Sequence, residues 1–87
     1  MKVIVKTKFL SWKEFEDHTL IIDSRTNKQV HRLNEVGALL WKSIEQDTTK
    51  DSLVETLLDT YDVSKQDADK DVEEFLKTLR SKALINE

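Results

Sequence analysis

The chain contains no cysteine, no proline and only one glycine, Gly37. Without cysteine it can form no disulfide, no thiolate zinc site and no iron–sulfur cluster. A glycine-rich phosphate loop is also excluded, because several glycines are needed to bring backbone N–H groups close to a phosphate. No apolar run approaches the roughly 18 residues of a membrane span, and residues 1–6 are too few and too charged for a signal peptide. We therefore expect a cytoplasmic protein that makes no contact with membranes.

Excess positive charge is missing as well. The 87 residues include 17 acidic and 14 basic side chains and carry a net charge of −3. Nucleic acids and anionic membranes attract proteins through clustered positive charge, so this balance gives no general affinity for either. A chain of this length buries only about 60% of its unfolded surface. We expect it to form a single domain over residues 1–87.

The N-terminal third predicts strands, over about residues 2–33. Val3 and Val5 alternate with Lys2, Ile4 and Lys6, a short pattern of period two that is compatible with an edge strand. The segment 18–23 is rich in β-branched residues, 24–27 supplies turn-forming side chains, and 28–33 returns as the partner strand of a hairpin. The register of the polar segment that precedes this hairpin stays open. The expected result is an antiparallel β-hairpin or three-stranded sheet.

The remaining two thirds predict three helices, over about residues 35–46, 50–60 and 65–82. In each, apolar residues recur every three or four positions, which is the period of a helix with one buried face. Each also begins after a side chain that can accept a hydrogen bond from the first turn. These capping residues are Asn34, Thr49 and Ser64. A small N-terminal sheet followed by three helices is an α+β fold, and we expect a winged helix-turn-helix.

That architecture raises the question of DNA binding, which the charges disfavour. The predicted last helix has as many acidic as basic residues, so it offers no basic face to phosphates or base edges. The basic residues are Lys65, Lys70, Lys77, Arg80 and Lys82, and the acidic ones are Asp67, Asp69, Asp71, Glu73 and Glu74. A winged-helix DNA-binding regulator stays an alternative hypothesis, and we expect no nucleic-acid partner.

Catalytic groups in a useful arrangement are hard to find. The two histidines, His18 and His31, do not have a metal-binding spacing, although a two-histidine site across the hairpin is geometrically conceivable. Acid–base chemistry needs a desolvated carboxyl group, whereas Glu73 and Glu74 are expected on a solvated helix face. No nucleophile has an identifiable base. We therefore expect neither an enzyme nor a bound metal or cofactor.

Three short motifs in a fixed order carry a resemblance to a known family. They are Leu33-Asn34 with Gly37 and Leu40-Trp41, then Tyr61-Asp62-Val63, then Asp71-Val72 with Phe75-Leu76. In this order and at these separations they resemble the PqqD-like family, small proteins that bind the leader segments of ribosomally made precursor peptides. The resemblance extends from about Leu20 to Leu84, with Ala83 where the family often has glycine. It is poor before His18.

The resemblance implies a non-catalytic adaptor. In the family, the leader adds as an extra strand along the second strand of the hairpin, in a cleft bounded by the last helix. On this sequence the docking edge would be Lys28, Gln29, Val30, His31 and Arg32. The facing wall of the helix would be Asp69, Val72, Glu73, Leu76 and Arg80. The adaptor would present the precursor to a separate peptide-modifying enzyme, such as a radical SAM maturase or a leader peptidase.

Backbone hydrogen bonds alone would not hold such a leader. Each contributes about 0.5–1.5 kcal/mol net, whereas a micromolar complex needs about 8 kcal/mol after the entropy cost of association. Apolar leader side chains must therefore fill pockets, which we expect beside Val72 and Leu76. An open strand edge also permits pairing between copies, so we expect a monomer or a weak homodimer. A structural subunit of a larger enzyme complex stays open as a further alternative.

Overall fold

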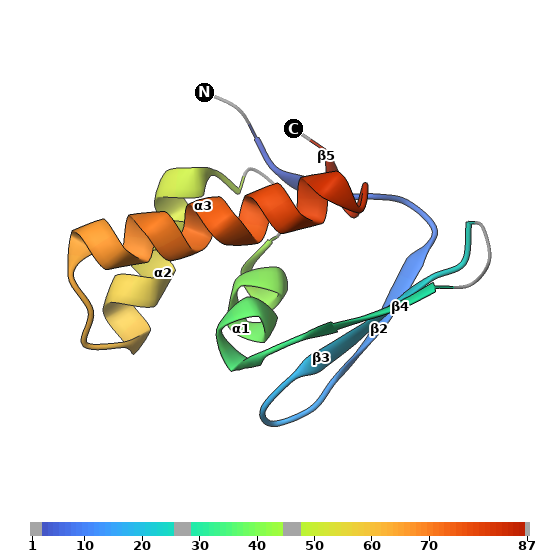
Figure 1. Ribbon diagram of the computed structural model, residues 1–87, viewed down its shortest axis with the longest axis horizontal. Helices are drawn as coiled ribbons and strands as arrows, with labels where there is room; N and C mark the ends of the chain where they lie inside the picture. Colours follow the sequence, from blue (N-terminus) through green and yellow to red (C-terminus); the bar gives the residue numbers. More distant parts are fainter. Residues whose placement is uncertain (1–2, 26–28, 45–47, 87) are drawn as a thin grey trace.

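The computed structural model describes residues 3–25, 29–44 and 48–86 (Figure 1). Its first half is an antiparallel sheet of three strands in the order β2-β3-β4. The strands are β2 (Leu10–Glu14), β3 (Thr19–Asp23) and β4 (Gln29–Leu33). Three helices follow, so the predicted α+β fold with an N-terminal antiparallel sheet is confirmed. The winged helix-turn-helix name stays a prediction.

The strand register decides which side chains face the helices. Ile21 in the central strand pairs with Trp12 on one side and with His31 on the other. Ile21 is fully buried, whereas its neighbour Ile22 and the opposite residue Val30 are 39% and 59% exposed. Because side chains alternate along a strand, Trp12 and His31 share the inner face with Ile21. One face of the sheet therefore packs on the helices and the other stays open.

The helices begin where their capping residues predict. They are α1 (Glu35–Ser43), α2 (Lys50–Thr60) and α3 (Lys65–Ser81). In each case the side chain of the residue before the helix accepts a hydrogen bond from a backbone N–H of the first turn. These bonds are Gly37 N to Asn34 Oδ1 at 2.8 Å, Ser52 N to Thr49 Oγ1 at 3.2 Å, and Asp67 N to Ser64 Oγ at 3.1 Å.

Helix α1 is shorter than the expected 35–46, and this is a correction. It ends at Ser43, and the next residue, Ile44, has an extended backbone. Ile44 is only 3% exposed, so its side chain is part of the core although its backbone has left the helix. The rest of the expected helix, residues 45–47, lies outside the described residues.

The core lies between the inner face of the sheet and the three helices. It joins residues from every element except β1, β2 and β4, and in α3 it takes one residue in every three or four. The buried core residues are Ile4, Ile21, Leu40, Trp41, Ile44, Leu53, Val54, Leu57, Ala68, Val72, Leu76, Leu79, Leu84 and Ile85. Trp12 of β2 closes one side of it, with its ring edge-on to Trp41 at a centroid distance of 5.4 Å.

The two ends of the chain form a second, separate sheet. Strand β1 (Val5–Lys6) pairs antiparallel with β5 (Ile85–Asn86). The expected N-terminal strand therefore exists, but its partner is the C-terminal tail and not the hairpin. The tail turns back because Ala83 adopts a left-handed φ of 56°, and Leu84 N then donates to Leu79 O at 2.9 Å. This is the usual way to end a helix, with alanine in a position that favours glycine.

Within the described ranges, no helix is long and apolar enough to cross a membrane.

Candidate functional site

Strand β4 is an open edge of the three-stranded sheet. It pairs with β3 on one side, and no strand of the described chain lies on its other side. The outward backbone N–H and C=O groups of an edge strand can pair with an extended peptide. Four residues of the predicted edge, Gln29, Val30, His31 and Arg32, belong to this strand. The fifth, Lys28, lies outside the described residues.

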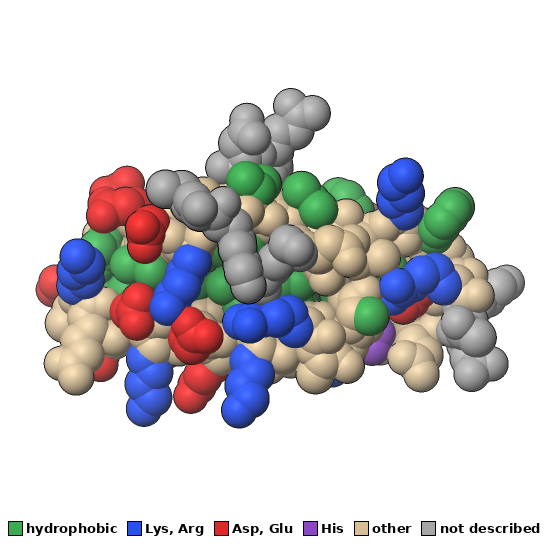
Figure 2. All heavy atoms as spheres, turned by 90° about the horizontal axis from the view of Figure 1, so that it is seen from above, with side chains coloured by type: hydrophobic (Ala, Val, Ile, Leu, Met, Phe, Trp, Pro, Cys, Tyr) green, Lys and Arg blue, Asp and Glu red, His purple; other side chains and the backbone are tan. Residues whose placement is uncertain are grey.

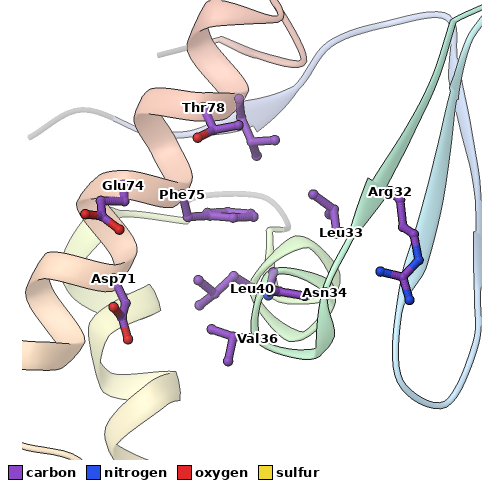
Figure 3. Close-up of a pocket in the computed structure, with 11 residues that line it drawn as sticks. Arg32, Leu33, Asn34, Val36, Leu40, Asp71, Glu74, Phe75 and Thr78 are labelled. Carbon is purple, nitrogen blue, oxygen red and sulfur yellow. The ribbon is translucent and has the colours of Figure 1, made fainter.

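A cavity of about 360 Å³ lies between β4, the start of α1 and α3 (Figure 3). Its wall is mainly apolar in the middle and charged at the rim. It is lined by Arg32, Leu33, Asn34, Val36, Gly37, Leu40, Asp71, Glu74, Phe75, Thr78 and Leu79. Small-molecule sites usually span about 300–1,000 Å³, so this cavity is at the small end. It suits one or two side chains of a peptide.

The tight connection between β4 and α1 forms one wall of the cavity. Asn34 caps α1 directly after the last residue of β4, so the strand runs into the helix without a loop. A Cβ at Gly37 would lie 3.3 Å from both Asn34 Oδ1 and Leu33 Cβ, which is closer than ordinary contact. Glycine at this position therefore lets the first turn of α1 lie against the end of β4. Only a short sequence motif, Leu33-Asn34 with Gly37, is needed to build this corner.

Helix α3 turns one particular margin toward the cavity. Besides the buried Leu79, its lining residues are Asp71 and the residues three, four and seven positions after it, which share one side of the helix. These are Glu74, Phe75 and Thr78. Figure 3 shows Phe75 and Thr78 extending from α3 toward the strand, with Asp71 and Glu74 further along the same helix. We call these four residues the cavity margin of α3. They combine an aromatic ring, a hydroxyl group and two carboxylates.

The polar residues predicted for the facing wall lie on the other margin of α3 and do not line this cavity. Lys50 at the start of α2 pairs with Asp69 at 3.4 Å and with Glu73 at 2.5 Å. Arg80 pairs with Glu73 at 3.6 Å. Because Asp69 and Asp71 are two residues apart, they point about 200° from one another around the helix. We call Asp69, Glu73 and Arg80 the paired margin of α3, and the structure does not bring it to the cavity.

The two apolar residues predicted for the wall are part of the core. Val72 is 0% exposed and Leu76 is 2% exposed, so neither presents a surface to a ligand. The apolar wall is instead made by Phe75, which is half-buried, together with Leu33 and Val36. Hydrophobic periodicity identifies the buried centre of a helix, but it does not say which flank meets a neighbouring strand. The sequence alone therefore could not tell which flank of α3 lines the cavity.

On β4 the predicted residues split between the two faces of the strand. Val30 and Arg32 are exposed, and Arg32 lines the cavity rim. His31 lies on the inner face, opposite the buried Ile21. Its Nε2 atom is enclosed and has no hydrogen-bond partner in the described part of the chain. The accessible features of the edge are thus its outward backbone and the side chains of Val30 and Arg32.

An ion pair at the end of the hairpin connects it to the end of α3. Arg25 donates to both carboxylate oxygens of Asp23, at 2.9 and 2.6 Å, and to the carbonyl oxygen of Ala83, at 3.0 Å. These hydrogen bonds from Arg25 lower the pKa of Asp23 to about 2. Because Ala83 follows the last turn of α3, the contact ties the hairpin to that helix. Local sequence patterns could not reveal this contact, because Arg25 and Ala83 are 58 residues apart.

The described residues contain no group of three or more histidine, cysteine, aspartate or glutamate side chains that could hold a metal ion. The chemistry that the cavity does offer is recognition: backbone groups on one side, an apolar centre, and charges of opposite sign at the rim.

Comparison with known proteins gives both a family and a fold. The sequence model of the family described as "Coenzyme PQQ synthesis protein D (PqqD)" matches residues 19–85, which is well over half of the chain. No curated protein matches by sequence.

Two solved structures share the fold over nearly the whole chain. One is described as TbiB1 in complex with the TbiA(beta) leader peptide; it is 20% identical, with a TM-score of 0.85 and 94% of both chains covered. The other is a lasso peptide synthetase B1 complexed with the leader peptide; it is 16% identical, with a TM-score of 0.84, and 99% of this chain and 100% of that chain are covered. The likeness in each case is one of fold.

Proposed function

The chain belongs to the PqqD family, and we propose that it is a non-catalytic adaptor that binds the leader segment of a ribosomally synthesised precursor peptide. The observation that carries the proposal is an open strand edge, β4, beside a cavity with an apolar centre. The two similar folds described above are themselves complexes with leader peptides. In this proposal the whole chain, residues 1–87, acts as one recognition domain.

The leader would add to the sheet as a fourth strand, next to β4. Strand addition supplies backbone hydrogen bonds, while pockets for alternate side chains supply selectivity. A few bonds at about 0.5–1.5 kcal/mol each leave a micromolar complex several kcal/mol short. Burial of an apolar leader side chain adds about 1.5–3 kcal/mol. The cavity beside Phe75 and Val36 is where this side chain would go.

The adaptor would then present the precursor to a separate modifying enzyme, such as a radical SAM maturase or a leader peptidase. The outer face of the sheet supports this part of the proposal, because it exposes the adjacent side chains of Ile22 and Val30. That face points away from the inner side of the sheet and stays open when a peptide fills the cavity. The substitution Ile22→Asp should leave leader binding unchanged and slow modification of the precursor by the enzyme. Equal rates for the two proteins would contradict this part of the proposal.

The test of leader binding is a fluorescence-anisotropy titration at physiological salt. A short precursor reading frame is first sought beside the gene, and its labelled leader is the probe, with duplex DNA as the parallel ligand. We expect saturable binding of the leader at micromolar concentration or below, and no binding of the DNA. Binding of the DNA alone would instead favour the DNA-binding alternative and contradict the adaptor proposal.

A further inference from the structure

The two acidic residues of the cavity margin have no ion-pair partner in the described part of the chain. Asp71 and Glu74 are both exposed, and neither has a cation within 4.0 Å among these residues. Their counterparts on the paired margin, Asp69 and Glu73, are bridged by Lys50. The contrast lies within one helix, between acids of the same type and similar exposure. Within the described ranges, two negative charges therefore stand at the rim of the cavity without an ion-pair partner.

The opposite rim of the cavity carries a positive charge. Arg32 of β4 is exposed, lines the cavity, and likewise has no ion pair among the described residues. Its side chain leaves from the same face of the sheet as Val30, because side chains alternate along a strand. A strand added to β4 would therefore have the acids of α3, and not this arginine, beside its inner face. The arrangement would thus attract a peptide that offers positive charge toward the helix. It would disfavour an acidic one there, because like charges brought together cost binding energy.

The spacing of the helix matches that of a strand. Asp71 and Phe75 are one helical turn apart, about 6 Å along the axis at 1.5 Å per residue. Side chains on one face of a strand recur every second residue, about 6.6 Å apart. A peptide side chain seated against Phe75 would therefore have its next neighbour on the same face at the level of Asp71. Glu74 lies between these two positions, on the same margin.

From this geometry we propose that the leader recognised here is basic: it carries a lysine or arginine two residues from an apolar anchor. The anchor occupies the cavity beside Phe75, and the basic residue pairs with Asp71 and Glu74. This inference rests on the proposed function and deepens it, because it states the chemical class of the leader. The direction of the added strand decides whether the basic residue comes before or after the apolar anchor in the leader sequence.

The first test selects binders from a phage-displayed library of random peptides. The wild-type protein should enrich sequences with Lys or Arg two residues from an aliphatic or aromatic residue. The variant Asp71→Asn/Glu74→Gln should keep the apolar residue and lose the basic preference. The matched control, Asp69→Asn/Glu73→Gln, removes the same charge from the paired margin and should enrich the same sequences as the wild type. Circular dichroism spectra establish that all three proteins have the same fold.

The second test measures the pairing directly. One enriched peptide and its Lys→Gln or Arg→Gln version are titrated against the wild type and both double variants. Loss of the basic residue should weaken binding to the wild type and to the control by about five- to tenfold at low salt. The same change should have little effect on binding to Asp71→Asn/Glu74→Gln. High salt should reduce the difference, since exposed charges are screened.

The outcomes separate this inference from the function on which it rests. Enriched peptides that share an apolar residue but no basic one would overturn the inference and leave the proposed function intact. Equal losses in both double variants would also overturn it, because they would report a general charge effect. A folded wild-type protein that enriches no peptide and binds no leader would overturn both.

Discussion

The two margins of α3 carry similar acidic residues but place them in different surroundings. On one margin, Asp69 and Glu73 are held by Lys50, and Arg80 approaches Glu73. On the other, Asp71 and Glu74 line a cavity opposite a strand edge and have no such partner within the described ranges. Figure 2 shows acidic and basic side chains intermingled over one face of the molecule. Pairing of charge, more than charge itself, distinguishes the two sides of the helix.

The comparison of the two margins distinguishes acidic residues that pair with other side chains of the protein from acidic residues that are available to a ligand. Ion pairs on the surface contribute little to stability, but they remove charge from the surface that they cover. An uncompensated pair of acids beside an apolar cavity retains its charge for a partner. Between the two margins lies the buried centre of α3, which serves the fold alone.

The largest effect should follow from a change in that buried centre. Leu76 is 2% exposed and belongs to the core cluster, so Leu76→Ala should lower the free energy of unfolding by about 2–5 kcal/mol. Urea unfolding followed by circular dichroism measures the loss. A change below about 1 kcal/mol would mean that Leu76 lies at the ligand surface, as the sequence suggested.

The next effect concerns the cavity margin and appears in binding. Thr78 is exposed and lines the cavity, so Thr78→Trp should fill the space that an apolar anchor needs. Loss of about 1.5–3 kcal/mol of burial should weaken leader binding roughly ten- to hundredfold. The control is Ser81→Trp, which adds the same ring to an exposed position of α3 outside the cavity. Similar losses from both substitutions would show that the cavity is not the binding site.

A smaller effect should appear when Asp23 is titrated, because its ion pair with Arg25 helps to hold the hairpin against the end of α3. The folded protein holds the pKa of Asp23 at about 2, below its ordinary value of 3.8, because Arg25 donates to the carboxylate. A depressed pKa stabilises the fold fully above the ordinary value, and this contribution is lost as the pH falls through the folded value. The stability difference between the wild type and Asp23→Asn should therefore shrink as the pH falls from 4 toward 2. Urea midpoints across this range measure it, and a constant difference would contradict the ion pair.

The smallest effect should distinguish the margins by stability alone. The variant Asp69→Asn/Glu73→Gln removes the partners of Lys50 and should lower the melting temperature slightly. Asp71→Asn/Glu74→Gln removes unpaired acids and should leave it unchanged or raise it slightly. Thermal unfolding at low salt, where surface charges act most strongly, makes the comparison. The reverse order of melting temperatures would remove the distinction between a paired and a cavity margin.

Much of the fold could be predicted from local sequence signals. Capping side chains at Asn34, Thr49 and Ser64 marked the starts of all three helices, because the bonds they make are local. The hairpin of β3 and β4 was visible for the same reason. The pairing of β1 with β5 was not, since it joins residues about eighty positions apart and neither strand exceeds two residues. Nor could the sequence show that α1 ends at Ser43, so that the buried Ile44 has an extended backbone.

The candidate site was predicted only in part. The open edge of β4 was expected and is present in the structure. The residues expected for the wall on α3 do not line the cavity, and their part in binding stays a prediction. Asp71 and Phe75 were part of a recognised sequence motif, and a helical wheel places them on one flank of the buried stripe. What the sequence lacked was the packing of α3 against its neighbours. Lys50, from α2, decides which flank is covered, and that contact is tertiary.

The most direct test of the central claim is an NMR titration of the ¹⁵N-labelled protein with the leader from the neighbouring precursor reading frame. Strand addition beside the cavity predicts amide shifts along β4, at the start of α1 and on the cavity margin from Asp71 to Thr78. The other open edge of the sheet, β2, and the paired margin around Asp69 should stay unchanged. Shifts confined to β2 or to the paired margin would contradict the account.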